Sequence, residues 1–168
     1  MEIIQIFNKT IHKREGFDCG IDTLNKYLKF QVSQDLKRKL SVCFVLVKNE
    51  TKEIKGYYTL SNAGIPLIDF PDKIRKKLPK SYNSIPATLL ERLAVDLKYQ
   101  HKGLGELLLV DALKKSFITS LKVGSFAVIV DPINEQAKKF YEKFGFVELP
   151  DSKKLFLPMH SLKELVEQ

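Results

Sequence analysis

Apolar residues recur along this chain in short runs that alternate with stretches of helical spacing. The runs are rich in β-branched and aromatic residues and are bounded by Gly, Pro, Asn or Asp, which is typical of strands. The strands predicted in this way are residues 3–7, 42–47, 54–60, 89–96, 126–130 and 155–157. Turn residues between the second and third of these strands predict a β-hairpin.

Three segments repeat apolar residues at intervals of three and four, as amphipathic helices do. The first follows a turn at 17–20 and reaches about Leu40. The second covers 105–117, where two adjacent apolar rows indicate a largely buried helix. The third begins after Asn134, a predicted N-cap, and ends at Gly145.

The order of these elements predicts an α/β fold. In the second half of the chain, strands and helices alternate, which implies a right-handed parallel crossover between the strands at 89–96 and 126–130. Four prolines between residues 66 and 86 leave room there for only one short helix, at 72–78. We find no linker and no repeat, and we expect a single domain over residues 1–168.

The net charge of the chain indicates what kind of partner it binds. Its 168 residues include 28 Lys and Arg against 20 Asp and Glu, a net charge of +8. This excess is more than solubility requires and favours a polyanionic partner. The alternative is a solvated basic face on the short helix and its flank, which hold Lys73, Arg75, Lys76, Lys77 and Lys80.

Several classes of protein are excluded. The apolar runs are shorter than the roughly 18 residues that a membrane span needs, and the acidic N-terminal residues 1–4 lack a signal-peptide core. We therefore expect a cytoplasmic protein with no membrane partner. Cys19 and Cys43 are too few for a disulfide framework, and neither they nor the three histidines have metal-ligand spacing, so we expect no disulfide and no structural metal.

The most informative segment is a basic turn with two glycines between the strand at 89–96 and the helix at 105–117. The first turn of a helix has about four backbone N–H groups without helical acceptors and a partial positive charge, so it binds anions. The turn lacks the Gly-Lys-Ser/Thr of a P-loop and the three-glycine spacing of a dinucleotide site. A phosphorylated cofactor is the expected ligand of its residues, which are Gln100, His101, Lys102, Gly103, Leu104 and Gly105.

This turn resembles the pyrophosphate loop of the GNAT superfamily of N-acetyltransferases. The family's Gln/Arg-x-x-Gly-x-Gly/Ala motif matches Gln100, Gly103 and Gly105, and residues 134–146 resemble its next motif, in which Phe-Tyr precedes Phe-Gly-Phe. The resemblance implies acetyl-CoA as the cofactor. It also implies a mixed central sheet that is splayed at the cofactor site and has helices on both faces.

The chain departs from the family's pattern in two places. Inside the loop, the family usually has a small residue and an Arg or Lys. This chain has His101 and Lys102 there, and Lys102 keeps a charge that can pair with a phosphate. Pro132 and Ile133 stand where many relatives have small residues, next to the expected pantetheine arm.

The resemblance also implies roles for individual residues. The backbone N–H groups of Leu93, Ala94 and Val95 are expected to face the cofactor arm and the thioester oxygen, and Asn134 to hydrogen-bond the pantetheine. Tyr141 is the expected general acid that protonates the departing thiolate. Because Tyr141 also lies on the apolar stripe of its helix, it could be a core residue, and a buried ring with its hydroxyl in the active site satisfies both interpretations.

Two charged residues precede this strand end. Arg92 is expected to steer the 3′ end of a nucleic-acid substrate, and the alternative is that it pairs with an acid such as Asp96. Glu91 is the nearest carboxylate for removing a proton through water, unless it is a solvated charge.

Within the superfamily, the chain resembles the GNAT toxins of bacterial toxin–antitoxin pairs. Segments at 17–20, 56–61 and 85–96 match the toxins in the same order. The resemblance implies acetylation of the α-amine of aminoacyl-tRNA and a ribbon-helix-helix antitoxin as partner, and it leaves a homodimer open. The alternatives are a GNAT acetyltransferase of a protein N-terminus or small amine, and a non-catalytic acetyl-CoA-binding module.

Overall fold

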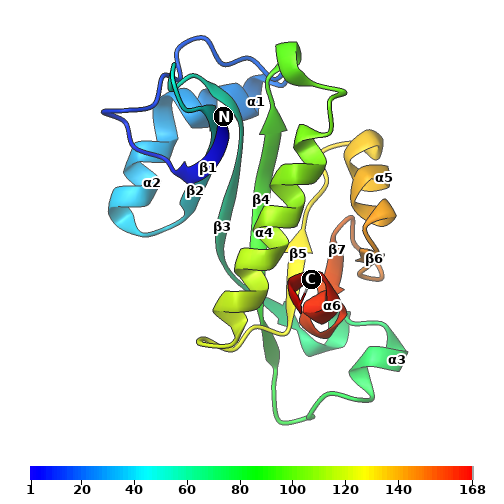
Figure 1. The fold of residues 1–168 in the computed structure, drawn as a ribbon. Helices are drawn as coiled ribbons and strands as arrows, with labels where there is room; N and C mark the ends of the chain where they lie inside the picture. Colours follow the sequence, from blue (N-terminus) through cyan, green and yellow to red (C-terminus); the bar gives the residue numbers. More distant parts are fainter. Residues whose placement is uncertain (168) are drawn as a thin grey trace. The chain divides into compact units, whose positions relative to one another are not determined.

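In the computed structural model, which describes residues 1–167, three long elements connect two units of the chain (Figure 1). The first unit holds residues 1–61 and 90–112, and the second holds residues 62–89 and 113–167. The elements that pass from one unit into the other are β3 (Ile54–Pro66), β4 (Ser84–Val95) and α4 (Leu104–Ser120).

The first unit contains two antiparallel strand pairs. β1 pairs with β2 from Glu2↔Lys48 to Ile6↔Phe44, β2 pairs antiparallel with β3, and β4 lies next to β3. The predicted hairpin is therefore confirmed. The other elements of this unit are β1 (Glu2–Ile6), α1 (Asp22–Lys26), η1 (Tyr27–Gln31), α2 (Val32–Arg38), β2 (Val42–Lys48) and η3 (Leu97–Tyr99).

The first helix is interrupted, in contrast to the continuous helix predicted up to Leu40. Residues Tyr27–Gln31 form a π-helical turn between α1 and α2, and Lys39 ends the helix in the left-handed conformation. The Arg14 Nη1 donates to the Leu28 carbonyl at 3.0 Å, so a side chain from outside the helix supports this turn. Such turns occur frequently at functional sites.

One glycine allows β3 to approach the neighbouring backbone. A Cβ atom at Gly56 would lie 2.9 Å from the Ala94 carbonyl oxygen and 2.8 Å from a methyl group of Leu108. Real Cβ contacts are not this short, so any side chain here forces strand β4 or helix α4 to shift.

Replacing Gly56 with Ala is therefore expected to destabilise the fold. Overpacking of this kind costs about 1–3 kcal/mol, which chemical denaturation would measure as a lower midpoint at unchanged slope. Gly16→Ala is the matched control, since a Cβ at Gly16 meets no atom within 4 Å. Equal stability of the two variants would contradict the close approach.

A buried histidine joins β1 to the loop that follows it. His12 is 4% exposed, its Nδ1 accepts from the Asn8 N–H at 2.9 Å, and its Nε2 lies 2.6 Å from the Gln5 amide. Burial, and then the charge of Lys52, lower the pKa of His12 from its ordinary 6.5. The folded protein thus favours the neutral ring.

The stability of the protein is expected to fall as the pH decreases below about 6.5. A folded pKa below the unfolded value means that the unfolded chain binds the proton first, so the contribution of His12 is complete above pH 6.5 and is lost during acidification. His12→Asn, which cannot gain this charge, should show a smaller loss between pH 6.5 and 5 in denaturation experiments. Parallel losses would contradict the role of His12.

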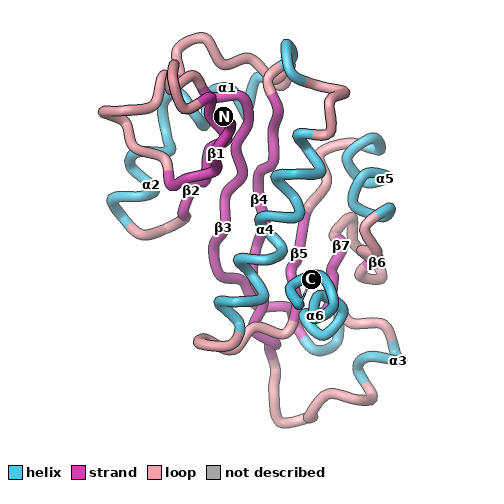
Figure 2. Tube along the Cα trace, in the orientation of Figure 1, coloured by secondary structure: helices cyan, strands magenta, loops and turns pink. Residues whose placement is uncertain are grey.

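The second unit contains parallel and antiparallel strand pairs. Figure 2 marks the strands in magenta and the helices in cyan. β4 pairs parallel with β5 from Ala87↔Ala127 to Leu89↔Ile129, β5 pairs antiparallel with β7, and β7 with β6. The remaining elements are η2 (Leu67–Asp69), α3 (Asp72–Arg75), β5 (Ala127–Val130), α5 (Glu135–Lys143), β6 (Val147–Glu148), β7 (Leu155–Pro158), η4 (Met159–Leu162) and α6 (Lys163–Glu167).

The α/β fold with a mixed sheet is confirmed, and β4 and β5 have the predicted parallel pairing. The boundaries differ most around the prolines. β4 begins five residues earlier than predicted because Pro86 lies within the strand, where its carbonyl accepts from the Phe126 N–H at 2.8 Å. β3 continues past the predicted end at residue 60, α3 is shorter than predicted, and β6 and α6 were not predicted.

Candidate active site

The end of strand β4 in the first unit is fastened by a buried carboxylate. Asp96 is 3% exposed, its Oδ2 accepts from the Asp18 N–H at 3.0 Å and its Oδ1 accepts from the Lys98 N–H at 2.9 Å. In return, the Leu97 N–H donates to the Asp18 carbonyl at 2.9 Å. The strand end and the turn at residues 17–20 are thus held together, and Asp96 is not the partner of Arg92.

The Gln100 side chain continues this attachment. Its Nε2 donates to the Val95 carbonyl at 2.9 Å and to the Cys19 carbonyl at 3.1 Å. The predicted cofactor-binding residue Gln100 therefore supports the loop from inside, which leaves the loop backbone to meet a ligand.

The backbone from residue 100 to 105 has an unusual conformation. His101 and Gly103 both have positive φ, 61° and 78°. Gln100 before them is extended, with φ of −66° and ψ of 159°. Turns with left-handed residues can direct successive N–H groups toward one point, an arrangement that binds anions. Helix α4 begins immediately at Leu104, with its first turn closed by the Leu107 N–H on the Gly103 carbonyl. The loop and the helix start can together bind a phosphate.

The backbone conformation, and not the lack of space for a side chain, favours glycine at position 103. A Cβ at Gly103 would meet no atom within 4 Å, but L residues other than Asn and Asp rarely adopt φ of 78°. His101 accepts the same conformation and is exposed.

Lys102 adds a positive charge beside the loop. Its Nζ donates to the Lys98 carbonyl at 3.3 Å and lies 5.6 Å from the centre of the Tyr99 ring. The ammonium is exposed and keeps further donors for an anion.

Arg92 is held rigidly on β4. Its guanidinium lies 3.7 Å above the Tyr27 ring, and its Nη1 pairs with the Glu91 Oε2 at 2.8 Å. Tyr27 stacks in turn on Tyr57, whose hydroxyl donates to the Leu24 carbonyl. The π-helical turn thus presents Tyr27 as a platform for the guanidinium.

The two charged residues before the strand end pair with each other. Arg92 pairs with Glu91 rather than with Asp96, and its side chain remains 17% exposed. Glu91 is 47% exposed and carries the ion pair, so its carboxylate is engaged by the neighbouring guanidinium.

Tyr141 lies in the second unit, in helix α5. The ring contacts Phe140 and Phe146 with centroids 5.4 Å apart in both pairs, and the residue is 7% exposed. Burial raises the pKa of Tyr141 well above its ordinary value, so the hydroxyl keeps its proton at neutral and moderately alkaline pH.

The ends of α5 are as predicted. The Asn134 Oδ1 accepts from the Ala137 N–H at 2.8 Å, which confirms Asn134 as N-cap and occupies this oxygen. At the other end, Gly145 has φ of 91°, and the N–H groups of Gly145 and Phe146 bond back to the last turn. Pro132 is half-buried and Ile133 is exposed just before this cap.

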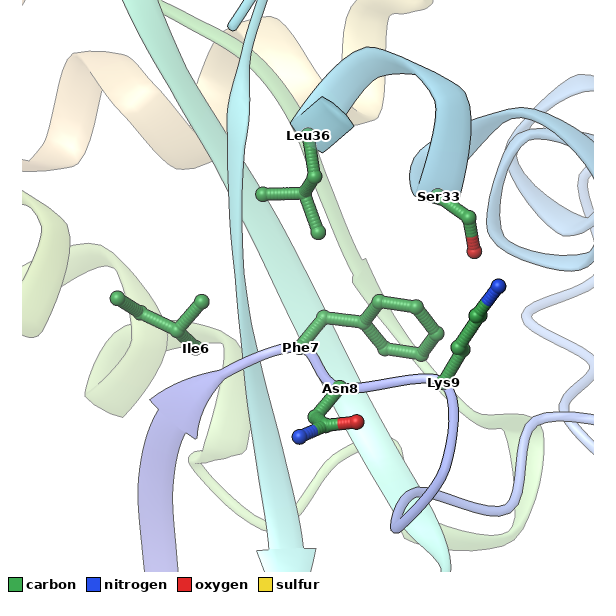
Figure 3. A pocket seen from close by; sticks show the side chains of 6 residues that line it. All are labelled: Ile6, Phe7, Asn8, Lys9, Ser33 and Leu36. Carbon is green, nitrogen blue, oxygen red and sulfur yellow. The ribbon is translucent and has the colours of Figure 1, made fainter. Parts of the chain in front are cut away.

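A pocket of about 360 Å³ in the first unit contains none of the predicted site residues. Figure 3 shows Phe7 and Leu36 forming its apolar wall, with the Lys9 and Ser33 side chains directed toward one another. It is lined by Ile6, Phe7, Asn8, Lys9, Ser33 and Leu36.

The supporting roles of three residues were not predicted from the sequence. Asp18 and Asp96 tie the strand end to the turn before α1, and Tyr27 supports Arg92. For Asp18 and Asp96 the only signal was the similarity of residues 17–20 and 85–96 to known toxins, and Tyr27 lies outside these segments. The contacts join positions about 65 to 78 residues apart, which a local pattern does not reveal. Among residues 1–167, no cluster of three His, Cys, Asp or Glu could hold a metal, and no helix is long and apolar enough to cross a membrane.

Known proteins resemble this chain over most of its length. The relatives include a tRNA-acetylating toxin of Mycobacterium tuberculosis, 31% identical over 90% of this chain and 89% of the relative. A probable toxin TacT of Sinorhizobium fredii is 24% identical over 98% of this chain and 94% of its own.

Solved structures agree with these relatives. A tyrosine-to-phenylalanine mutant of KacT has a TM-score of 0.91 and 31% identity, covering 98% of both chains. AtaT complexed with acetyl-methionyl-tRNAfMet has a TM-score of 0.91 and 30% identity, covering 98% of this chain and 99% of the other. The sequence profile of the family described as "Acetyltransferase (GNAT) domain" matches residues 40–148, and this protein therefore belongs to the GNAT acetyltransferases.

Proposed function

We propose that this acetyltransferase is a cytoplasmic toxin that acetylates the α-amine of aminoacyl-tRNA and is restrained by an antitoxin. The observation that carries the proposal is the loop at residues 100–105, whose two left-handed residues lead directly into helix α4. The substrate is supported by relatives named as a tRNA-acetylating toxin and as AtaT with acetyl-methionyl-tRNA. The antitoxin is supported by AtaT in complex with AtaR.

The loop fits the diphosphate of acetyl-CoA. The backbone N–H groups from His101 to Gly105, the start of α4 and the Lys102 ammonium would hold its oxygens. When bound, acetyl-CoA supplies the acetyl thioester. Gln100 keeps the loop in shape through its two hydrogen bonds to carbonyl groups.

The end of β4 is assigned to the cofactor arm. β4 pairs with β5 through Leu89 and continues to Val95, so a ligand could meet the N–H groups of Leu93, Ala94 and Val95 beyond this pairing. Aimed at the thioester oxygen, preorganised donors of this kind contribute about 3–4 kcal/mol to transition-state stabilisation. Asn134 would hydrogen-bond the pantetheine through its amide Nδ2, since its Oδ1 caps α5.

Tyr141 is assigned the general acid. Its raised pKa keeps the hydroxyl protonated, so it can transfer a proton to the departing thiolate. The amine of an aminoacyl ester has a lower pKa than a lysine side chain, so much of it is already neutral near pH 7 and the need for a strong base falls. Because Glu91 is paired with Arg92, we assign the amine proton to water and Arg92 to the last phosphodiester of the tRNA, next to its aminoacylated 3′ end.

Acetyl transfer from labelled acetyl-CoA tests the proposal. Aminoacyl-tRNA, a polyamine and a peptide with a free N-terminus would be offered to the purified protein in parallel. We expect label in the aminoacyl-tRNA alone. Labelling of the peptide or polyamine instead would support the small-amine alternative, and acetyl-CoA binding without any transfer would support a non-catalytic module.

A further inference from the structure

The segment around α3 in the second unit concentrates positive charge. Residues 72–80 hold five basic side chains and one acidic side chain, a net charge of +4, which is half of the chain's +8. Arg75 pairs with Asp72. The other four, Lys73, Lys76, Lys77 and Lys80, are exposed and have no ion pair within residues 1–167. These four lysines are called the α3 patch.

The α3 patch is attached to the core by its apolar neighbours. Phe70, Ile74 and Leu78, spaced four residues apart, face the core of the second unit. Phe70 is 2% exposed and makes edge-to-face contacts with Phe126 and Phe156, with centroids 5.6 Å and 5.4 Å apart. Because Phe70, Ile74 and Leu78 bury one face of the segment, the lysines between them point toward solvent.

An exposed aromatic ring follows the patch. Tyr82 is 52% exposed, and its N–H donates to the Pro79 carbonyl at 3.3 Å, which fixes the turn after the lysines. Lysines beside an exposed aromatic side chain are typical of nucleic-acid surfaces, where the ammonium groups meet phosphates and the ring meets a base or ribose. A membrane surface is disfavoured because α3 has only four residues and forms no long amphipathic helix.

We propose that the α3 patch binds the phosphate backbone of the double-helical body of tRNA. This proposal rests on the proposed function for the identity of the RNA. It adds that the enzyme holds its substrate through the stem as well as at the aminoacyl end. Each lysine that neutralises a phosphate releases counterions, so the patch makes binding steeply dependent on salt.

Binding of labelled, uncharged tRNA over a range of KCl concentrations tests the patch. The variant carries Lys73→Gln, Lys76→Gln, Lys77→Gln and Lys80→Gln, and the control carries Lys114→Gln, Lys122→Gln, Lys153→Gln and Lys154→Gln, four exposed lysines of the same unit. We expect the patch variant to bind roughly ten-fold or more weakly, with a salt slope reduced by about 1 for each lysine on a phosphate. Equal affinities of variant and control, or wild-type binding to anionic vesicles but not to tRNA, would overturn the proposal.

A short substrate separates this proposal from the proposed function. An aminoacylated 3′-terminal trinucleotide offers the same amine without the stems. The patch variant should acetylate it as the wild type does, within about two-fold, while its kcat/KM for aminoacyl-tRNA falls in line with the weaker binding. If the wild type acetylates neither substrate, the proposed function fails, and the tRNA-binding experiment still decides whether the patch binds RNA.

Discussion

Replacing Tyr141 with Phe is expected to lower the rate of acetyl transfer by a factor of about 10² to 10⁴. The substitution removes only the hydroxyl that would protonate the thiolate, and it keeps the ring that packs against Phe140 and Phe146. Turnover would be measured with labelled acetyl-CoA, and acetyl-CoA affinity by titration calorimetry. The affinity should stay within about two-fold of the wild type, because the ring is unchanged.

Two outcomes would contradict the role of Tyr141. Unchanged turnover in the Phe variant would leave the residue a core side chain only. A loss of turnover together with a large drop in melting temperature would point to damaged packing of α5. Deprotonation of Tyr141 is also not expected to lower wild-type turnover up to about pH 9, because burial holds the pKa of its hydroxyl above the ordinary value for tyrosine.

Replacing Gly103 with Val is expected to weaken acetyl-CoA binding by roughly ten-fold or more. A β-branched residue is a severe outlier at φ of 78°, so the loop must leave the conformation that gathers its N–H groups. A ten-fold weaker affinity corresponds to a loss of about 1.4 kcal/mol in the free energy of binding. Titration calorimetry with acetyl-CoA would measure it.

Gly103→Asn provides the matched comparison. Asn tolerates the left-handed region, and a side chain at this position meets no atom within 4 Å. The Asn variant should therefore bind acetyl-CoA within a few-fold of the wild type. If Val and Asn weaken binding equally, the side-chain volume rather than the backbone conformation is responsible.

Local chemistry made several parts of this fold predictable. The cap formed by Asn134 and the left-handed stop at Gly145 depend on residues within one helical turn, and both are where the sequence indicated. The apolar runs of β2 and β5 were similarly clear because both strands are largely buried.

Other features depend on distant partners and were not predictable. Pro86 indicated an interruption, yet it lies in β4 because its free carbonyl meets the N–H of Phe126, forty residues later in the chain. The π-helical turn at Tyr27 is supported by Arg14 from outside the helix. The pattern of apolar positions does not indicate that Phe126 or Arg14 makes these contacts.

In the candidate site, too, features set by neighbouring residues were predictable and features set by distant partners were not. The glycines and basic residues at 100–105 predict an anion loop, and the positive φ of His101 and Gly103 is compatible with it, because backbone conformation and charge are local properties. The direction of the Gln100 amide, inward to Cys19 and Val95, required the folded chain. A motif therefore proposes the residues of a site without telling which of their side chains point into the protein.

Three hydrogen bonds couple the strand end and the loop to the turn before α1 thermodynamically: Gln100 Nε2 to the Cys19 carbonyl, the Asp18 N–H to the Asp96 carboxylate, and the Leu97 N–H to the Asp18 carbonyl. Opening of that turn releases the loop, so a ligand that binds only the ordered loop must lower the equilibrium constant for opening by the factor 1 + [L]/Kd. The amide hydrogens of Asp18 and Leu97, which bond across this junction, report the opening directly through their exchange with solvent. Occupancy of the loop can therefore be followed at residue 18, far from it in sequence.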